Sequence, residues 1–339
     1  MTIRLGLVGY GAGGRIFHAP YIAAVPEIEL VGVVTGNAER RREVAADLGV
    51  PVFDSLGDLI DAGVDAVTIT TPPQTRRDLV LEAIGRGVHV VADKPFAPDA
   101  AGGRELAAAA EAAGVVLNVF HNRRFDADIA TVRAVLPRLG ELWRIESRYD
   151  LDEPGGLDAG PTGGLLRDLG AHLVDQMLLL CGPAESVTAH LDWVDLPAGT
   201  TDCGFVVSIS HRSGVFSTVS ASKLNHLAAR QWRVYGSLGA YESDGTDAQT
   251  DQILAGRRPA DDPDTWGYER QDRLGTLHTA AGTETVPSAQ GRIQDYYRQF
   301  AAAIESGAPQ PVPAIEGVAV LEVLDAARRS DAEGVTIRL

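Results

Sequence analysis

The sequence is poor in cysteine and in positive charge. Among its 339 residues only Cys181 and Cys203 carry thiols, and they show no metal-ligand spacing. We therefore expect no metal site and a reducing cytoplasmic setting. The formal net charge is -16 at pH 7, so a phosphate backbone would be repelled and nucleic acid is not an expected partner. A small anionic cofactor is still compatible with this charge, because backbone N–H groups can bind it.

Long apolar runs are also absent. No uninterrupted stretch approaches the ~18 residues that a membrane span needs. The first residues, MTIRLGLVGYG, carry one arginine and then glycines instead of an apolar signal segment. Hydrophobic residues make up 45% of the chain and charged residues 22%, which is the balance of a globular protein. We expect a soluble cytoplasmic protein without a membrane partner, and an enzyme is the leading class.

The first third of the chain alternates short apolar runs with alanine-rich amphipathic stretches. The apolar runs are nearly continuous in Val, Ile and Leu, as in strands covered on both faces. They are 3–9, 28–34, 65–71, 89–93 and 115–120. The expected helices are 39–49, 75–87 and 100–114, each with a glycine near its end. This alternation predicts an α/β fold with a doubly wound parallel sheet.

After His121 the pattern changes to that of an α+β domain with a large, mainly antiparallel open sheet. A turn at Ser213-Gly214 joins two of its strands. The polar stretch 244–285 is expected to be irregular. The other expected elements are helices at 126–136, 166–181, 291–306 and 314–330, a strand at 141–150 and a Gly/Pro-rich loop at 153–164. The length favours two domains, which we place at 1–121 and 122–339, with C-terminal helices that can pack back on the first.

Gly9, Gly11 and Gly14 follow the first expected strand in G-x-G-x-x-G spacing, at the start of a helix. The first glycine permits a tight turn, the second lets the backbone approach a pyrophosphate, and the third packs helix against strand. The helix N-terminus adds the positive end of its dipole. Glycines also serve ordinary turns, but in this strand–loop–helix context the pattern predicts dinucleotide binding.

The end of the second expected strand indicates which dinucleotide is preferred. Thr35, Gly36 and Asn37 stand where an NAD-preferring site usually has a carboxylate. Arg40 begins a run of three arginines just beyond. A solvated basic helix face is the alternative explanation of this run. The missing carboxylate and the nearby arginines together favour NADP(H) over NAD(H).

The fourth expected strand ends in Asp93, Lys94 and Pro95, within the segment HVVADKPF. A lysine at a strand end is often only a charge that reaches water. Here the strand end belongs to the carboxyl edge of the expected sheet, where ligands bind, and the proline holds Lys94 in an extended conformation. We therefore expect the Lys94 ammonium to face the ligand.

The expected helix 166–181 carries Asp168 and His172, four residues apart on one face. A histidine is the natural proton carrier near neutral pH, and a carboxylate can orient it. Such pairs are also common in purely structural roles. The glycine-rich segment GPTGGLL before the helix would let a ligand approach, and the segment HNRRF (121–125) follows the fifth strand at the ligand edge.

Several of these segments together carry a family resemblance: GYGAGGRIFHAP, TTPPQTR, HVVADKPFAP, HNRRF and GGLLRDLGAHLVDQ. Over essentially its whole length the sequence resembles the glucose–fructose oxidoreductase/inositol dehydrogenase/MocA (Gfo/Idh/MocA) family, nearest its NADP-dependent scyllo-inositol dehydrogenase branch. The resemblance implies a Rossmann domain and an α+β domain whose open sheet mediates dimers or tetramers. It also implies that Lys94 and His172 contact the reacting hydroxyl and that Asp168 supports them.

Two residues depart from the family pattern. The usual Glu-Lys-Pro motif has Asp93 in place of the glutamate, and the Thr-Pro-x-x-x-His segment ends in Arg76 in place of the histidine. Neither change removes a proposed proton-transfer group. Relatives also suggest a cis bond between Lys94 and Pro95.

The expected site comprises three sets of residues. The catalytic residues are Lys94, Asp168 and His172. The cofactor contacts are Gly9, Gly11, Ala12, Gly13, Gly14, Thr35, Asn37, Arg40, Thr71, Pro72, Asp93, Lys94 and Asn122. The substrate contacts are Lys94, Asn122, Arg123, Tyr149, Asp168 and His172. Trp266 is expected to fill a groove and not to cap a ligand.

These residues predict reversible hydride transfer between a nicotinamide and a secondary carbinol carbon of a cyclic polyol or sugar. His172 would accept the hydroxyl proton and Lys94 would stabilise the developing alkoxide. Two alternatives stay open: a dinucleotide-binding regulator without redox chemistry, and a glycoside hydrolase of the same family that recycles a bound NAD.

Overall fold

The computed structural model describes residues 2–160 and 163–339, which fold into two compact units. The first unit contains the residues up to Asn122 together with Gln252–Trp266 and Arg292–Val318. The second unit contains Arg123–Asp251, Gly267–Gly291 and Ala319–Leu339. The chain therefore returns to the first unit twice after leaving it.

The first unit is built on a parallel sheet of six strands in the order β3-β2-β1-β4-β5-β6. The strands are β1 (Ile3–Val8), β2 (Ile28–Val34), β3 (Val52–Phe53), β4 (Ala66–Ile69), β5 (His89–Ala92) and β6 (Leu117–Val119). Every residue of β4 and β6 is buried, as expected for strands covered on both faces. The order reverses between β1 and β4, so the carboxyl ends of these two strands form the topological switch point.

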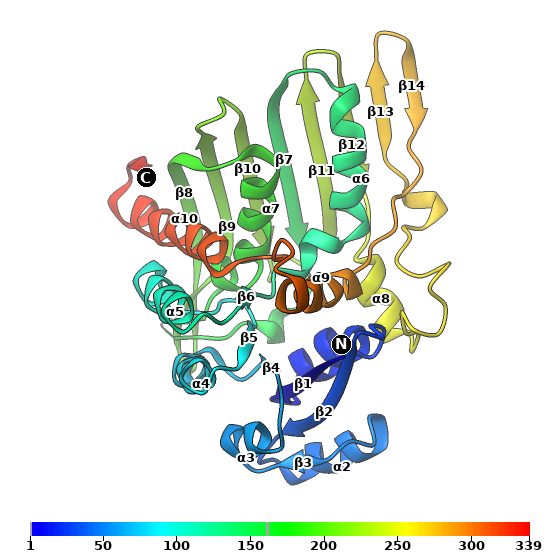
Figure 1. The fold of residues 1–339 in the computed structure, drawn as a ribbon. Helices are drawn as coiled ribbons and strands as arrows, with labels where there is room; N and C mark the ends of the chain where they lie inside the picture. The colour runs from blue at the N-terminus through cyan, green and yellow to red at the C-terminus, as the bar shows by residue number, and fades with distance from the viewer. Residues whose placement is uncertain (1, 161–162) are drawn as a thin grey trace. The chain divides into compact units, whose positions relative to one another are not determined.

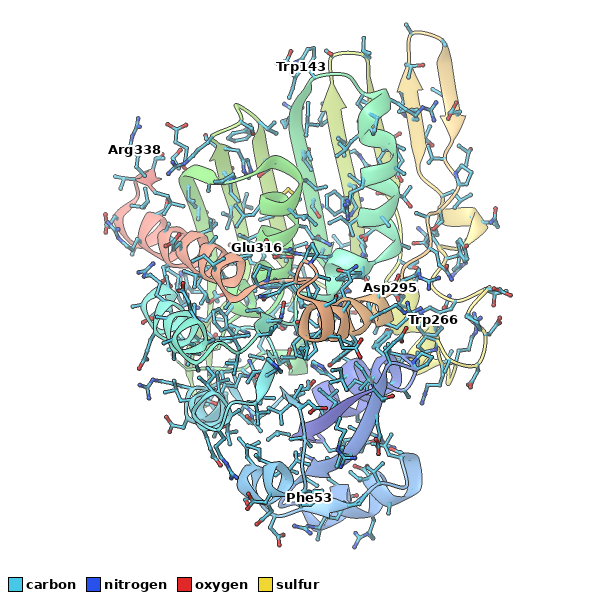
Figure 2. The ribbon with its side chains drawn as sticks, in the orientation of Figure 1. Phe53, Trp143, Trp266, Asp295, Glu316 and Arg338 are labelled. Carbon is cyan, nitrogen blue, oxygen red and sulfur yellow. The ribbon has the colours of Figure 1, made fainter. Side chains whose placement is uncertain are left out.

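Helices connect these strands (Figure 1). They are η1 (Gly13–His18), α1 (Ala19–Ile22), α2 (Ala38–Asp47), α3 (Leu56–Asp61), α4 (Pro73–Gly85) and α5 (Ala100–Ala113). A later segment of the chain adds α9 (Gln294–Ser306) to the same unit. The expected strands and helices are confirmed, but β3 and α3 were not expected. Both are short, and a two-residue strand has no periodicity to detect. Trp266 is fully buried and meets Tyr21 edge to face, with ring centroids 6.2 Å apart, so it fills the interior as expected (Figure 2).

The second unit contains a nine-stranded sheet in the order β14-β13-β12-β11-β7-β10-β9-β8-β15 among the described residues. Its strands are β7 (Leu142–Asp150), β8 (Ala184–Leu196), β9 (Gly199–His211), β10 (Phe216–Ser222), β11 (Ala229–Gly236), β12 (Gly239–Asp244), β13 (Thr276–Thr279), β14 (Gly282–Thr285) and β15 (Ile337–Arg338). Only β7 and β10 pair in parallel within this described sheet. The expected fold class is therefore confirmed, as is the turn at Ser213-Gly214, where Gly214 has φ +88°.

One face of this sheet is covered by helices. Along β7 the buried Ile145, Ser147 and Tyr149 alternate with the more exposed Arg144 and Arg148. Figure 1 shows α6 and α7 along the covered face. The helical segments that belong wholly or partly to this unit are η2 (Asn122–Phe125), α6 (Ala127–Val135), η3 (Leu136–Arg138), η4 (Pro154–Gly156), η5 (Leu166–Gly170), α7 (Ala171–Cys181), α8 (Ala248–Leu254), η6 (Gln271–Arg273) and α10 (Ala314–Glu333). We call the opposite face, to which Arg144 and Arg148 point, the open face.

The stretch 244–285 was wrongly expected to be irregular. It contains α8, η6 and the hairpin of β13 and β14. The hairpin strands are only four residues long and rich in threonine, so they have no apolar run. The pairing of β13 with β12 joins the hairpin to the sheet. Within the described part of the chain, no helix is both long enough and apolar enough to cross a bilayer.

Candidate functional site

The glycine loop lies at the topological switch point of the first unit. Gly9 has φ +101°, and a Cβ placed on it would lie 2.8 Å from Oγ1 of Thr70, the residue that follows β4. A Cβ on Gly14 would lie 2.3 Å from the Gly9 carbonyl oxygen. Both positions therefore require glycine, and the loop has the close approach that a pyrophosphate site needs. Thr70 was missed from the sequence, although the neighbouring Thr71 and Pro72 were named.

The helix after the loop begins as a π-helix, η1, directly at Gly13, and Ala12 is its N-cap residue. Single π turns occur often at functional sites. Behind the loop, Thr71 Oγ1 accepts a hydrogen bond from Thr75 at 2.9 Å, and Pro72 is the N-cap of α4. These contacts hold the segment between β4 and α4 in place.

The residues after β2 have distinct local roles. Asn37 is the N-cap of α2, and its Oδ1 accepts from the backbone N–H groups of Glu39 and Arg40 at 2.9 and 3.0 Å. Thr35 is buried. The Arg40 guanidinium lies over the glycine loop, because Nη2 is 3.7 Å from the position that a Cβ on Gly11 would take. Arg41 instead pairs with Asp54.

A buried polar network surrounds the β5 end in the first unit. His18 Nδ1 lies 2.5 Å from the hydroxyl of Tyr297, and its Nε2 lies 3.8 Å from Asp93 Oδ2. Arg76 Nη2 lies 3.6 Å from the same carboxylate oxygen, and Arg76 Nη1 donates to the Pro95 carbonyl at 2.7 Å. His18 was not named from the sequence, although it lies in the segment GYGAGGRIFHAP.

This network keeps Asp93 ionised. Burial by itself would raise the pKa of Asp93, but His18, Arg76 and Lys94 hold it well below its usual range. Asp93 Oδ1 accepts from the Lys94 N–H at 2.8 Å, and Oδ2 lies 3.4 Å from the position of a Cβ on Gly13. The carboxylate therefore lies beside the glycine loop and accepts from the backbone of the next residue, Lys94. The Lys94–Pro95 peptide bond is cis.

In the second unit, Asp168 and His172 lie where the expected helix begins. Asp168 belongs to the π-helix η5 and His172 to the first turn of α7. The His172 residue is 6% exposed, whereas the Asp168 side chain is 45% exposed. Asp168 Oδ2 accepts from Lys223 Nζ at 3.1 Å, a partner that was not expected from the sequence. Pro161 and Thr162, in the glycine-rich segment before this helix, lie outside the described residues.

The start of η5 is held by a fully buried carboxylate, that of Asp202 in β9. Its Oδ2 accepts from the Leu166 N–H at 2.6 Å, and its Oδ1 accepts from Arg328 at 3.0 Å. A Cβ on Gly164, which has φ +95°, would lie 2.1 Å from Oδ1. The glycine before the helix therefore makes room for a capping carboxylate from the sheet.

Arg123 and Tyr149 belong to a buried ionic cluster of the second unit. Arg123 Nη1 lies 2.7 Å from Asp247 and 3.0 Å from Asp126, and the Tyr149 hydroxyl donates to Asp247 at 2.8 Å. Arg230 lies 2.7 Å from Asp126 in the same cluster. Burial alone would raise the pKa of Asp247, but Arg123 and Arg230 hold it well below its usual range. The cluster gives Arg123 and Tyr149 a structural role that was not expected.

Asn122 is the last residue of the first unit's opening segment and is 6% exposed at the start of η2. Arg124, from the same HNRRF segment, binds both carboxylate oxygens of Asp175, at 2.8 and 2.6 Å. Among the described residues, no group of three or more His, Cys, Asp or Glu is arranged to hold a metal ion.

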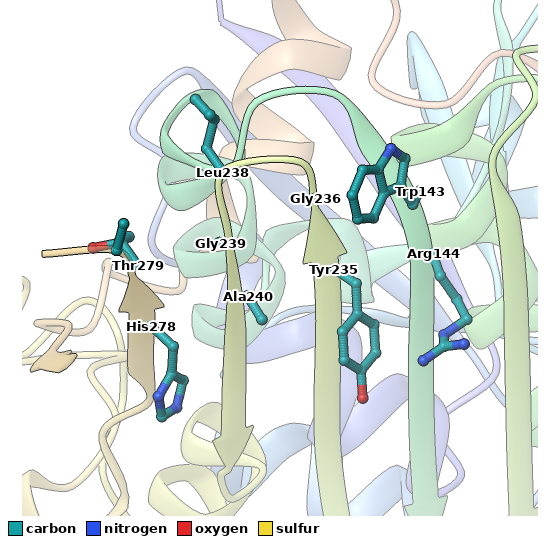
Figure 3. Close-up of a pocket in the computed structure, with 10 residues that line it drawn as sticks. Trp143, Arg144, Tyr235, Gly236, Leu238, Gly239, Ala240, His278 and Thr279 are labelled. Atoms are coloured by element: carbon teal, nitrogen blue, oxygen red, sulfur yellow. The ribbon is translucent and has the colours of Figure 1, made fainter. Parts of the chain in front are cut away.

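The open face of the large sheet carries a shallow hollow of about 520 Å³ (Figure 3). Trp143, Arg144, Tyr235, Leu238 and His278 are among the residues that line it. The Arg144 guanidinium lies over the Tyr235 ring, 4.4 Å from its centroid. Few polar side chains converge there, so the hollow has less of the character of a catalytic site than the glycine loop has.

Comparison with known proteins agrees with this geometry. Residues 3–121 match the family model described as "Oxidoreductase family, NAD-binding Rossmann fold", and residues 138–339 match its C-terminal alpha/beta domain. The chain is 32% identical to scyllo-inositol 2-dehydrogenase (NADP(+)) of Bacillus subtilis, over 100% of this chain and 96% of that protein. It is 30% identical to inositol 2-dehydrogenase of Rhizobium meliloti, over 98% of each.

A solved structure gives the same result for the fold. An oxidoreductase from Bacillus cereus superimposes with a TM-score of 0.88 at 26% identity, over 100% of this chain and 99% of that one. Both domains of the family are therefore present in one chain and in family order. The protein belongs to the Gfo/Idh/MocA family of oxidoreductases.

Proposed function

We propose that the protein is an NADP(H)-preferring dehydrogenase that reversibly oxidises a secondary hydroxyl of a cyclic polyol or sugar of the scyllo-inositol kind. The observation that carries the proposal is the position of Asp93, which directly precedes Lys94 at the strand end and lies beside the glycine loop. The strand end that bears the lysine therefore lies next to the loop that would hold a dinucleotide. The full-length similarity to an NADP-dependent scyllo-inositol dehydrogenase supports the choice of substrate class.

The residues of the first unit fit a dinucleotide. The glycine loop would receive the pyrophosphate against its backbone N–H groups. Arg40, which lies over Gly11, would pair with a 2′-phosphate, and none of Thr35, Gly36 and Asn37 is a carboxylate that would repel it. A bound dinucleotide would supply the hydride acceptor or donor for the reaction.

Side chains of this protein would accept the hydroxyl proton and stabilise the negative charge on the substrate oxygen. During oxidation His172 would accept the hydroxyl proton at a ring nitrogen, and Asp168 would favour the resulting imidazolium. The Lys94 ammonium would stabilise the negative charge that develops on the substrate oxygen. Asn122 stays a candidate for reading substrate hydroxyls, whereas the cluster contacts of Arg123 and Tyr149 favour a supporting role for these two.

We also propose that the protein is cytoplasmic and forms a homodimer or homotetramer through the open face. Both cysteines are free thiols, which suits a reducing compartment. On the open face Val206 and Phe216 are 46% and 41% exposed. Exposed apolar side chains on a sheet face without a helical cover are typical of an association surface.

A panel of polyols and sugars, including scyllo-inositol, myo-inositol, glucose and xylose, tests the proposal with NADP and with NAD. We expect net NADPH formation with an inositol. Lys94→Ala should lower kcat by about 10²- to 10³-fold and leave NADPH binding nearly unchanged, because the lysine acts on the reacting oxygen. Arg40→Ala should weaken NADPH binding by about tenfold, or ~1.4 kcal/mol, and leave NADH binding unchanged.

Arg42→Ala is the matched control for Arg40→Ala, because it removes the same charge from the same helix. Full turnover by Lys94→Ala would contradict the mechanism, and tighter binding of NADH than of NADPH would contradict the cofactor preference. A tightly held cofactor without net redox change, together with glycoside cleavage, would favour the hydrolase. Dinucleotide binding without any turnover across the panel would favour the regulator.

A further inference from the structure

Lys223 is a buried lysine that directly contacts a proposed site residue. It follows β10, is 5% exposed, and its Nζ lies 3.1 Å from Asp168 Oδ2. The same ammonium donates to the Gly156 carbonyl at 2.8 Å and lies 3.8 Å from Glu153 Oε2. A single cation thus holds together the first turn of the His172 helix and the loop that follows β7.

The backbone of Lys223 is held as firmly as its side chain. Its N–H donates to the Cys203 carbonyl at 3.1 Å, and its carbonyl accepts from the Glu153 N–H at 3.3 Å. The residue is therefore fixed to β9 on one side and to the loop on the other. Such anchoring leaves the side chain little freedom, so the ammonium stays beside Asp168.

The use of lysine at this position is selective. The chain has 30 basic residues, and lysine occurs only at positions 94 and 223, so the other 28 (30 minus 2) are arginines. An ammonium is compact and offers three donors that can rotate toward separate acceptors, whereas a guanidinium is a rigid planar fork. Asp168 approaches from the start of the helix, and Gly156 and Glu153 approach from the loop after β7. The rotating donors of one ammonium can reach both segments. The rarity of lysine is the sequence signal that identifies Lys223.

We propose that Lys223 is a positioning residue that holds Asp168 in place as a carboxylate and offsets its charge. The inference rests on the function proposed above, in which Asp168 favours protonation of His172. With Lys223 present, its positive charge offsets part of the Asp168 charge that would act on the ring. Without its charge, the whole negative charge of Asp168 acts on the ring, and the protonated form of His172 is favoured more strongly.

The pH dependence of turnover should show how the charges of Asp168 and Lys223 together affect the protonation of His172. Alcohol oxidation needs neutral His172 as the proton acceptor, so its rate falls on the acid side where the ring is protonated. Lys223→Met should lower kcat by about 10- to 100-fold and move the acid limb to higher pH by roughly half a unit or more. NADPH binding should not change. Lys223→Arg restores the charge, so it should return the acid limb close to its original position.

Arg138→Met is the control, because it removes a positive charge of the same unit from an exposed ion pair with Glu284. We expect wild-type kcat and acid limb for this variant. A readout independent of activity comes from ε-¹³C-lysine labelling of the whole protein, which produces only two side-chain signals. Lys223→Met assigns one of them, and Asp168→Asn should shift that signal and leave the Lys94 signal less affected.

The outcomes separate the two proposals. Wild-type activity in Asp168→Asn would remove the mechanism proposed above and this inference with it. An inactive Asp168→Asn beside a Lys223→Met with unchanged kcat and acid limb would overturn the inference alone. A Lys223→Met variant that loses thermal stability but keeps the acid limb of its pH profile at the same pH would also overturn the inference, because it would show that the lysine is purely structural. If Lys223→Met does not fold, Lys223→Arg and the response of the Lys223 signal to Asp168→Asn decide the question.

Discussion

At the scale of single residues, the two departures from the family pattern meet in space. Arg76 is 5% exposed, and its guanidinium joins the Asp93 carboxylate to the Pro95 carbonyl. A short carboxylate and a long cation therefore pair at the two positions where the family pattern has a longer acid and a shorter base. Neither residue alone shows this relation in the sequence, because 17 positions (93 minus 76) separate them.

We predict that the effects of Arg76 and Asp93 on kcat/KM are coupled, because the sizes of the two side chains fit each other. Asp93→Glu should lower kcat/KM because the added methylene would press against Arg76 and the Gly13 backbone, and Arg76→His should lower it because Asp93 loses a close cation. The double variant should recover activity beyond the sum of the single effects, with a coupling of about 1 kcal/mol or more. Steady-state kinetics of all four proteins would measure it. Strictly additive effects would show that the two residues are independent.

At the scale of elements, the helix that carries Asp168 and His172 depends on a residue from the sheet. The apolar pattern predicted a helix at 166–181, and η5 and α7 together cover these residues. The pattern did not predict the π geometry of the first turn or its cap, Asp202, which lies 36 residues beyond Leu166. A cap supplied from a distant strand leaves no signal in the local sequence.

Asp202→Asn should destabilise the protein by about 2 kcal/mol, because the Leu166 N–H and the Arg328 guanidinium lose a charged acceptor. Burial raises the pKa of Asp202, yet the Leu166 and Arg328 contacts favour its charged form. Thermal and urea unfolding would measure the loss. Glu284→Gln, which removes an exposed carboxylate paired with Arg138, is the control and should change stability little. Equal stability of Asp202→Asn and wild type would show that η5 needs no cap.

At the scale of the whole molecule, each structural unit is built from three separate stretches of the chain. The alternation of strands and helices predicted the parallel sheet and the later antiparallel one, and both are present. The segment with α9 lies far along the chain, yet Tyr297 from this helix binds His18 of the first unit. Contacts of this kind can be identified only in the folded chain. The same is true of the exposed apolar side chains on the open face.

The open face should hold two copies together. Val206 pairs with Ser220 across β9 and β10, and Phe216 pairs with Ser210, so their side chains share the open face. A Val206→Glu/Phe216→Glu double variant should run as a monomer in size-exclusion chromatography with light scattering, because buried charges would oppose association. Leu254→Glu, at a residue that is 67% exposed outside this face, should keep the wild-type mass. A monomeric wild type, or an unchanged mass of the double variant, would contradict the interface.

The sequence by itself determined the fold class, the glycine loop and most helix and strand positions. These features rest on local periodicity and on glycines that no other residue can replace, as at Gly9 and Gly14. Only the tertiary structure decided which polar groups are partners: Asp93 with Arg76 and His18, Asp168 with Lys223, and Asp202 with the start of η5. The physical reason is that a hydrogen bond or ion pair depends on distance in space, and residues far apart in the chain come within that distance only when strands and helices pack.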